Sequence, residues 1–462
     1  MSDFDLVVSG RVVLTDRIID GGYVAVKDGK ISAIGVGKPP GAAERHDFGN
    51  SLVMPGAIDS QTHSRSQKNQ EDFVWSTRSA AAGGVTTIVD MPYDDDGKLI
   101  CTAERLREKA REAGEQARVD FALFGTVHPN DGAKHIADMV EAGAAAFKFS
   151  TFGTHPDRFP RIPPQTMFEC FSEIAKHDLM AGVHNENDEA VRAYISKVKD
   201  QGLTDYLSHG LSRPPITETL AIAEVYEIAA ATGCSAHIVH CSLARGYELS
   251  ANYRAQGFDT TIEACIHYLT LDEEDSVRRL VGKAKVNPPI RPRAQVEALW
   301  KHLGQGNITV VSTDHVSWSE DRKTNPNMLE NSSGAPGLEV LYSLLLKGLE
   351  EHGLSVTWAA RLLAANPARL FRLDHIKGAL ELGKDADITV MKANRYRYDP
   401  SESGHNVISW SPYEGMELPY RVEATFLRGQ QIFDGAKKVS APGTGHFLRP
   451  RSKTAARTLA IV

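Results

Sequence analysis

Short apolar runs separated by turn residues mark both ends of the chain. Residues 4–37 contain four such runs, with glycine and Asp-Gly turns between them, and the same texture returns at 383–394 and 421–435. Runs of this kind predict short β-strands. Because the ends of a domain often lie close together, the pattern predicts that both chain ends pair into one small β-domain.

The middle of the chain alternates apolar, β-branched runs with helical patterns such as residues 102–117 and 218–232. Continuous apolar runs are typical of buried parallel strands, and eight of them predict a closed (β/α)8 barrel. A doubly wound open sheet is the alternative, but no glycine-rich phosphate-binding turn follows the first strand. The eight runs are 52–59, 85–92, 119–127, 144–150, 179–187, 235–242, 259–269 and 308–315.

These patterns divide the chain into four parts. Residues 1–54 and 371–440 are expected to form a β-sandwich together, and residues 55–370 the α/β TIM barrel. Residues 441–462 are basic and loosely patterned, so they are expected to be an arm and not a domain.

Composition narrows the class of protein. The 462 residues are 42% hydrophobic and 24% charged, which is ordinary for a globular protein. A chain of this length is too long to fold around one simple core unless that core is a large barrel. The net charge of −7, with no dense basic block before the C-terminal stretch, argues against a nucleic-acid partner. No long apolar run or signal-like N-terminus is present, so a cytoplasmic protein without membrane contact is expected. The five cysteines form no C-x-x-C pair, which argues against disulfides and a structural zinc site.

Polar groups that can bind metal lie at or near the ends of five predicted strands. In a (β/α)8 barrel the carboxyl ends of the strands surround the active site, so these groups are expected to converge on one cavity. They are Gln61 and His63 on the first strand, Lys148 on the fourth, His184 on the fifth, His240 on the sixth and Asp314 on the eighth.

Strand periodicity sorts the histidines. Side chains alternate with a period of two, so Gln61 and His63 are expected on one face. His237 and His240 are expected on opposite faces, with His240 in the interior and His237 structural. For His267 and His315 two roles stay open: each could support the site or pack in the core.

Lys148 is unusual because it stands between apolar residues in a predicted strand. One interpretation is a lysine that reaches the rim or pairs with a carboxylate. The other is a lysine carboxylated by CO2, whose carbamate offers two oxygens to two metal ions.

Taken together, the motifs resemble those of the cyclic amidohydrolases of the amidohydrolase superfamily, which include hydantoinases, dihydropyrimidinases, allantoinases and dihydroorotases. The matching pieces run almost from end to end, in order and with suitable spacing. They include "MPGAIDSQTH", "AAAGGVTTIVDMP", "FKFSTF", "VHNEN", "HIVHCS", "VNPPIR", "STDH", "GAPGLE" and "KGALELGKDADITV". The resemblance implies a (β/α)8 barrel with a β-sandwich built from both chain ends.

The resemblance also implies roles for individual residues. His63 matches the second histidine of a His-x-His motif, Lys148 the carboxylated lysine that bridges the metals, and His184 and His240 the ligands of the second metal. Asp314 matches the ligand that carries the proton from a metal-bound hydroxide to the departing amide nitrogen. The implied cofactor is one or two divalent ions, zinc or alternatively manganese, together with the carbamate on Lys148.

Gln61 departs from the family pattern, which has a histidine at this position. A glutamine offers only a carbonyl oxygen, a weaker donor toward zinc than imidazole. A weakened first metal site is therefore expected.

Substrate-binding residues are implied less fully. Arg65 resembles an arginine that holds the substrate carboxylate in dihydroorotases, and Asn287 resembles a residue that meets the cyclic amide. Trp318 stands where dihydroorotases place a carboxylate-binding histidine, and Gly153 where hydantoinases place a tyrosine. The implied substrate is a small cyclic amide, imide or ureide.

Two classes of function remain. The first is a hydrolase that opens a cyclic C–N bond, and the second is a non-catalytic assembly protein of the dihydropyrimidinase-like or dihydroorotase-like kind. Retention of four metal-binding residues favours the enzyme, because a scaffold has no physical need for them. They are Lys148, His184, His240 and Asp314. The resemblance further implies a homodimer or a homotetramer.

Overall fold

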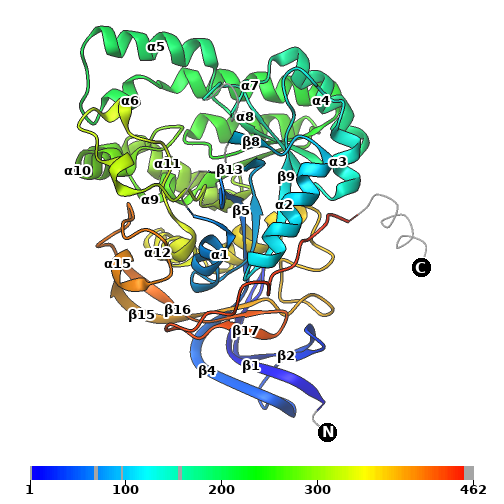
Figure 1. The fold of residues 1–462 in the computed structure, drawn as a ribbon. Coiled ribbons are helices and arrows are strands. Elements are labelled where there is room, and N and C mark those ends of the chain that lie inside the picture. The colour runs from blue at the N-terminus through cyan, green and yellow to red at the C-terminus, as the bar shows by residue number, and fades with distance from the viewer. Residues whose placement is uncertain (1–2, 67–70, 95–96, 155–158, 452–462) are drawn as a thin grey trace.

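The computed structural model describes residues 3–66, 71–94, 97–154 and 159–451. Figure 1 shows a barrel of strands and helices above a separate sheet that is built from strands near both ends of the chain. The predicted fold class, a (β/α)8 barrel with a β-domain from the chain ends, is confirmed.

The barrel is an eight-stranded sheet in the order β14-β13-β12-β11-β10-β9-β6-β5, with parallel neighbours. Nearly every strand residue is buried, as expected for strands that helices cover on one side and the barrel interior on the other. The strands are β5 (Ala57–Thr62), β6 (Val85–Asp90), β9 (Asp120–Gly125), β10 (Ala146–Ser150), β11 (Met180–His184), β12 (Ser235–Ile238), β13 (Thr260–Cys265) and β14 (Val310–Ser312).

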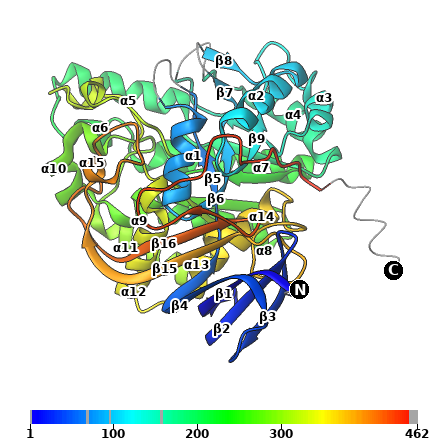
Figure 2. The same ribbon diagram turned by 60° about the horizontal axis from the view of Figure 1, so that its bottom comes forward.

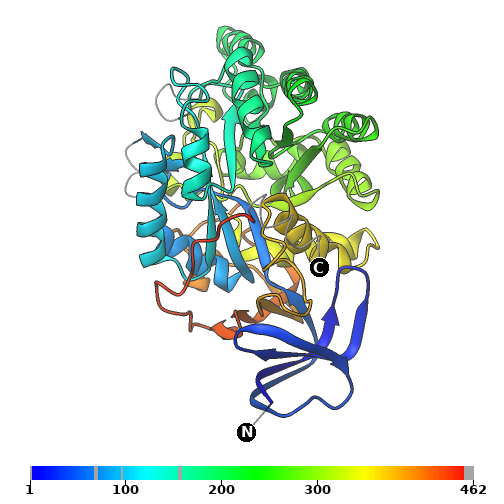
Figure 3. The ribbon, with the colours of Figure 1, turned by 90° about the vertical axis from the view of Figure 1, so that its right-hand side faces the viewer.

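Helices pack around the outside of the barrel strands (Figure 3). The longer ones are α1 (Phe73–Ala82), α2 (Ala103–Gln116), α4 (Pro164–Lys176), α5 (Asp188–Asp200), α7 (Pro215–Thr232), α8 (Ala244–Ala255), α11 (Arg293–Gly304) and α12 (Leu341–Glu351). Shorter ones are α3 (Ile136–Ala142), α6 (Ser208–Leu211), α9 (Ile266–Thr270), α10 (Arg278–Leu280), α13 (Thr357–Ala360), α14 (Asn366–Leu370) and α15 (Pro400–Ser403). A two-stranded ribbon, β7 (Tyr93–Asp94) and β8 (Lys98–Leu99), precedes α2.

The barrel closes between its first and last strands. Thr62 pairs with His315 as a parallel bridge, and the His63 amide donates to the His315 carbonyl at 3.0 Å. Below this bridge, the buried Asp59 carboxylate accepts from the Thr313 amide at 2.8 Å and from the Thr313 hydroxyl at 2.7 Å. The closure therefore fixes the end of β5 against the end of β14.

The chain ends form one seven-stranded sheet in the order β17-β16-β15-β4-β1-β2-β3. Strands from the two chain ends lie side by side in Figure 2, where β4 meets β15 in antiparallel register. The strands are β1 (Phe4–Val13), β2 (Ile18–Lys27), β3 (Lys30–Val36), β4 (Ala42–Pro55), β15 (Ile388–Arg397), β16 (Glu417–Leu427) and β17 (Gln430–Phe433).

The run 52–59, predicted as one strand, is divided between the two sheets. Its first half ends β4, and its second half begins β5. The change falls at Gly56, where a Cβ atom would lie 2.2 Å from the Thr86 hydroxyl. Only glycine lets the backbone pass this close to β6 on its way into the barrel.

Part of the expected C-terminal arm packs on the barrel. The Phe121 amide donates to the His446 carbonyl at 3.0 Å, the Leu448 amide donates back to Phe121 at 2.7 Å, and the Phe447 ring stacks on that of Phe121. Residues 452–462 lie outside the described residues. Among the described helices, none has both the length and the apolar character needed to cross a bilayer. The oligomeric state stays a prediction.

A buried ionic cluster joins the end sheet to the bottom of the barrel. The Lys377 ammonium lies 2.6 Å from Asp120, 2.9 Å from Asp385 and 2.7 Å from Asp387, and Arg428 also pairs with Asp120. Burial opposes the charge, but the three carboxylates outweigh it and raise the pKa of Lys377 above its ordinary value. Because a lysine cation already lies among these aspartates, the cluster is a structural link and not a metal site.

The Lys377→Met variant should lose about 3–5 kcal/mol of unfolding free energy, because three buried carboxylates lose their shared cation. Equilibrium urea unfolding followed by tryptophan fluorescence measures the loss. Lys392→Met is the matched control, since Lys392 pairs with Glu423 on the solvent side of the same sheet. Equal midpoints for the two variants would contradict a stabilising role for the cluster.

Candidate active site

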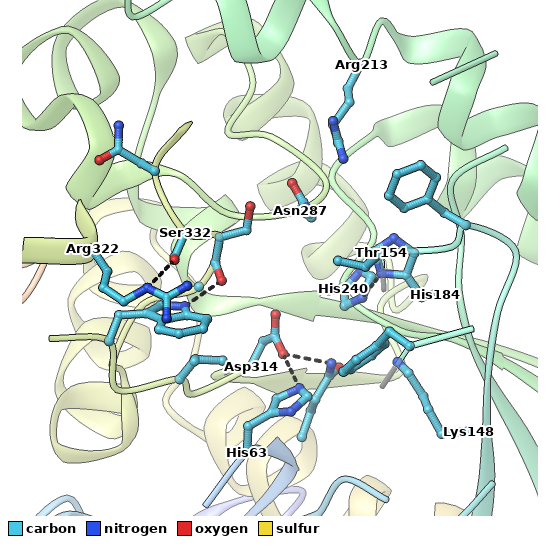
Figure 4. Close-up of a pocket in the computed structure, with 18 residues that line it drawn as sticks. His63, Lys148, Thr154, His184, Arg213, His240, Asn287, Asp314, Arg322 and Ser332 are labelled. Atoms are coloured by element: carbon cyan, nitrogen blue, oxygen red, sulfur yellow. Dashed lines mark hydrogen bonds and ion pairs between the residues drawn. The ribbon is translucent and has the colours of Figure 1, made fainter. Parts of the chain in front are cut away.

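A cavity of about 440 Å³ opens at the carboxyl ends of the barrel strands. All six predicted metal-site residues line it, and Figure 4 labels five of them, all except the glutamine, around a common space. They are Gln61, His63, Lys148, His184, His240 and Asp314. The convergence follows from parallel strands that end at the same rim.

His184 and His240 point ring nitrogens at each other across the cavity floor. Nδ1 of His184 lies 2.9 Å from Nε2 of His240, and the rings are nearly perpendicular. On the other side of its ring, His184 Nε2 contacts Glu186 at 2.9 Å. A proton on Nε2 satisfies this carboxylate and leaves a lone pair on Nδ1, the arrangement that orients metal-binding histidines. The two facing nitrogens are thus suited to share one cation.

Arg213 supports this arrangement from behind. Its Nε atom lies 3.0 Å from Glu186, and both side chains are buried. Burial alone raises the pKa of Glu186, but Arg213 and His184 outweigh burial and hold it below its usual value. Glu186 is therefore a carboxylate that fixes the His184 ring.

His240 lies beyond the end of β12, in a left-handed backbone conformation with φ of 40°. Its amide donates to the Glu263 carboxylate at 3.1 Å, which holds this unfavourable conformation. Strand alternation therefore does not decide its direction, although the cavity position was predicted. Burial, with His184 and Lys148 nearby, depresses the pKa of His240, so the ring is neutral and able to bind a cation.

Lys148 extends from the middle of β10 into the cavity and is 1% exposed. Its Nζ atom has no hydrogen-bond partner among the described residues. Burial lowers the pKa of this amine to about 8, against the opposing effect of Asp314 and Glu263. An unpartnered amine whose pKa is lowered in this way can react with CO2 in its neutral form, so the residue fits carboxylation.

Asp314 receives two contacts on one oxygen. Gln61 Nε2 donates to Oδ1 at 2.8 Å, and His63 Nε2 lies 3.3 Å from the same atom (Figure 4). Asp314 has a φ of 48°, a conformation that aspartate tolerates better than most residues. Burial raises its pKa, but the hydrogen bond and charge of His63 outweigh burial and lower it below the ordinary value. The side chain is thus an ionised base.

Gln61 leaves its carbonyl oxygen free. Since Nε2 donates to Asp314, Oε1 remains buried, and the described parts of the chain provide no partner for it. A cation at this place could take Oε1 as a ligand, so the residues present fit a metal ion, with a weaker donor than the expected histidine.

The two predicted substrate residues differ in position. Asn287 lines the cavity, and its buried Oδ1 has no partner in the described regions. Arg65 does not line the cavity: its guanidinium lies 2.5 Å from Asp94 and 2.7 Å from Glu112. Both of its carboxylate partners come from the β7–α2 region, which the sequence pattern did not connect to Arg65.

The three remaining histidines do not line the cavity. His237 contacts the Thr261 hydroxyl at 2.8 Å, as a structural residue would. His315 pairs with Glu71 at 2.5 Å beside the barrel closure. Burial lowers the pKa of His267 to about 4, so its ring is neutral.

Sequence reasoning missed several cavity residues on loops. Arg213 follows α6, while Phe152 and Phe159 follow β10, and none of them belongs to a periodic pattern. Arg322 and the segment 331–334 form the rim around Trp318. The carboxylate two residues after His184 was the one signal that could have indicated Glu186.

Comparison with known proteins agrees with this geometry. Residues 52–432 match the Amidohydrolase family. An allantoinase of Rubrobacter xylanophilus is 36% identical over 462 residues, covering 99% of this chain and 100% of the relative. An L-hydantoinase of Paenarthrobacter aurescens is 30% identical, covering 98% of this chain and 100% of the relative. The solved L-hydantoinase (dihydropyrimidinase) of Arthrobacter aurescens superposes with a TM-score of 0.92 at 29% identity, covering 96% of this chain and 100% of that structure.

The fold and the match define a barrel hydrolase, and the chain belongs to the amidohydrolase family. The predicted class of activity, metal-dependent hydrolysis of cyclic amides, is confirmed. The alternative of a non-catalytic assembly protein is not favoured.

The Glu186→Gln variant should bind divalent metal roughly 10–100-fold more weakly, because the His184 ring loses its fixed tautomer. Titration against a chromophoric chelator measures the affinity, with the unfolding midpoint recorded to detect lost folding. Glu189→Gln is the control, since Glu189 pairs with Arg161 at the surface. Unchanged affinity in a folded Glu186→Gln protein would show that this carboxylate does not orient a ligand.

Proposed function

We propose that the protein opens the ring of a cyclic ureide, with allantoin as the first substrate to test. The observation that carries this proposal is the convergence of His63, Lys148, His184, His240 and Asp314 on one cavity. The whole-length similarity to a protein named allantoinase supports the choice of ureide. A hydantoin with another ring substituent is the second candidate, supported by the relative named L-hydantoinase.

Two groups of residues would hold divalent metal. His184, His240 and the carbamate of Lys148 would form the tighter position, and His63, Asp314 and Gln61 the weaker one. Zinc is the proposed metal, since imidazole and carboxylate suit it, with manganese as the alternative. A divalent ion in this place polarises a carbonyl oxygen and lowers the pKa of water.

The side chains of the chain itself supply proton transfer and orientation. Asp314, ionised and held by His63 and Gln61, takes a proton from the attacking water and gives it to the departing ring nitrogen. The free Oδ1 of Asn287 accepts a hydrogen bond from a ring N–H group and so fixes the ring. The C–N bond breaks, and the product carries a carboxylate and a free ureido nitrogen.

Metal-loaded wild-type protein should hydrolyse allantoin, and Lys148→Ala should lose both this activity and most bound metal. A short-chain carboxylic acid should partly restore activity, because it can replace the carbamate oxygens. The rate at which the open-chain ureide appears measures ring opening. Mass spectrometry of the intact protein detects the carbamate on Lys148. Lys134→Ala, in the loop before α3, is the control.

Full activity in Lys148→Ala, or a plain lysine in active metal-loaded protein, would contradict the proposed role of Lys148. Absence of turnover of every cyclic ureide and cyclic imide by the metal-loaded wild type would contradict the proposed function itself.

The Gln61→His variant should bind a second metal ion at least about 10-fold more tightly than the wild type, because an imidazole replaces an amide oxygen. Metal content at limiting metal, measured by mass spectrometry, gives the occupancy without reference to turnover. Gln165→His is the control, since Gln165 lies at the surface of α4. Full occupancy of two sites in both wild type and Gln61→His would contradict a weakened first site.

A further inference from the structure

Arg322 forms part of the rim of the active-site cavity. Its guanidinium carbon lies 4.3 Å from the centre of the Trp318 ring, and its Nε donates to the Ser332 hydroxyl at 3.0 Å. Figure 4 shows this group on the side of the cavity across from His184 and Lys148, with Asp314 between. The cation therefore lies on the far side of Asp314 from His184 and Lys148.

The backbone that carries Arg322 is fixed before any ligand arrives. The Ser332 amide donates to the Arg322 carbonyl at 2.9 Å. The neighbouring Lys323 is buried, and its ammonium donates to the carbonyls of Lys285, Ser332 and Gly334 at 2.9, 2.7 and 2.8 Å. Stacking on Trp318 limits the guanidinium further. A preorganised cation of this kind loses little freedom when it binds an acceptor.

Charge pairing separates Arg322 from the other arginines near the site. Arg213 is neutralised by Glu186, and Arg65 is taken up by Asp94 and Glu112 outside the cavity. Within the described ranges, Arg322 makes no ion pair. Its two terminal guanidinium nitrogens, Nη1 and Nη2, have no protein carboxylate there to bind. An arginine fork in this state suits a carboxylate or a urea carbonyl.

We propose that Arg322 is a specificity-determining residue that recognises an oxygen acceptor, a carboxylate or a ureido carbonyl, on the substituent of the substrate ring. This proposal rests on the proposed function, because that function puts the substrate ring beside Asp314. With the ring there, the substituent extends along the face of Trp318 to Arg322. The aromatic walls at Phe152 and Phe159 are the competing feature, since they would favour an apolar substituent.

The test compares hydantoins that differ only in the substituent at ring carbon 5. The carboxymethyl and isobutyl compounds have nearly equal shape, and the ureido compound is allantoin. The wild type should prefer the carboxymethyl or the ureido compound to the isobutyl one in kcat/KM. In Arg322→Met this preference should fall roughly 10- to 100-fold, as expected for loss of a charged hydrogen bond. If the preference falls for only one of the two acceptor compounds, that compound carries the acceptor that Arg322 binds.

Arg361→Met is a matched control. Arg361 also stacks on a tryptophan, Trp358, at 5.1 Å, and also donates through Nε, in this case to the Thr15 carbonyl, but it does not line the cavity. Arg361→Met should keep the wild-type preference. Arg322→Lys should recover part of the preference, because it restores the charge without the planar fork.

Binding of the same three compounds to metal-loaded protein, measured by calorimetry, separates recognition from turnover. A wild type that opens none of the rings but binds the acceptor compounds more tightly than Arg322→Met contradicts the proposed function and supports the role of Arg322. An equal preference in the wild type and Arg322→Met, or an isobutyl preference in both, overturns the role of Arg322. In that case the aromatic side chains of Phe152 and Phe159 determine which substituent is preferred.

Discussion

The hydrogen bonds between Asp59 and Thr313 are the constraint on which the site depends. They join the first and the last barrel strand, so they determine where the barrel closes. Gln61 and His63 lie just above Asp59, and Asp314 follows Thr313 directly. A small shift between these strands would separate the base from the groups that hold it, because the contacts to Asp314 are short and directional.

Below the site, the Lys377 cluster gives the barrel a second fixed point. It ties Asp120, at the start of β9, to residues just before β15, and the Arg428 contact extends it to the β16–β17 turn. The His446 amide also donates to Asp120, which brings the C-terminal segment into the same network. The end sheet thus braces the barrel from the bottom and leaves the strand ends at the top free for chemistry.

The parts of the molecule that follow periodic patterns were predictable from sequence. Buried parallel strands produce continuous apolar runs, and two successive runs of this kind were enough to place Lys148 and His184 on neighbouring strands. The predictions failed or were incomplete where tertiary contacts decide. The division of residues 52–59 depends on how closely Gly56 approaches β6, and the ion pairs of Arg65 depend on a ribbon and a helix that follow it. Loop residues such as Arg213 carry no periodic signal at all.

Gln61 affects how Asp314 is held. A histidine in its place would offer a metal a nitrogen lone pair, a better donor toward zinc than an amide oxygen. The glutamine instead donates a hydrogen bond to Asp314 and joins His63 in holding that carboxylate in place. Stabilising the ionised form lowers basicity while it improves position, and general-base catalysis benefits from position as well as from basicity. Under the proposed function, the glutamine would leave one firmer cation position, at Lys148, His184 and His240, beside a separately held base.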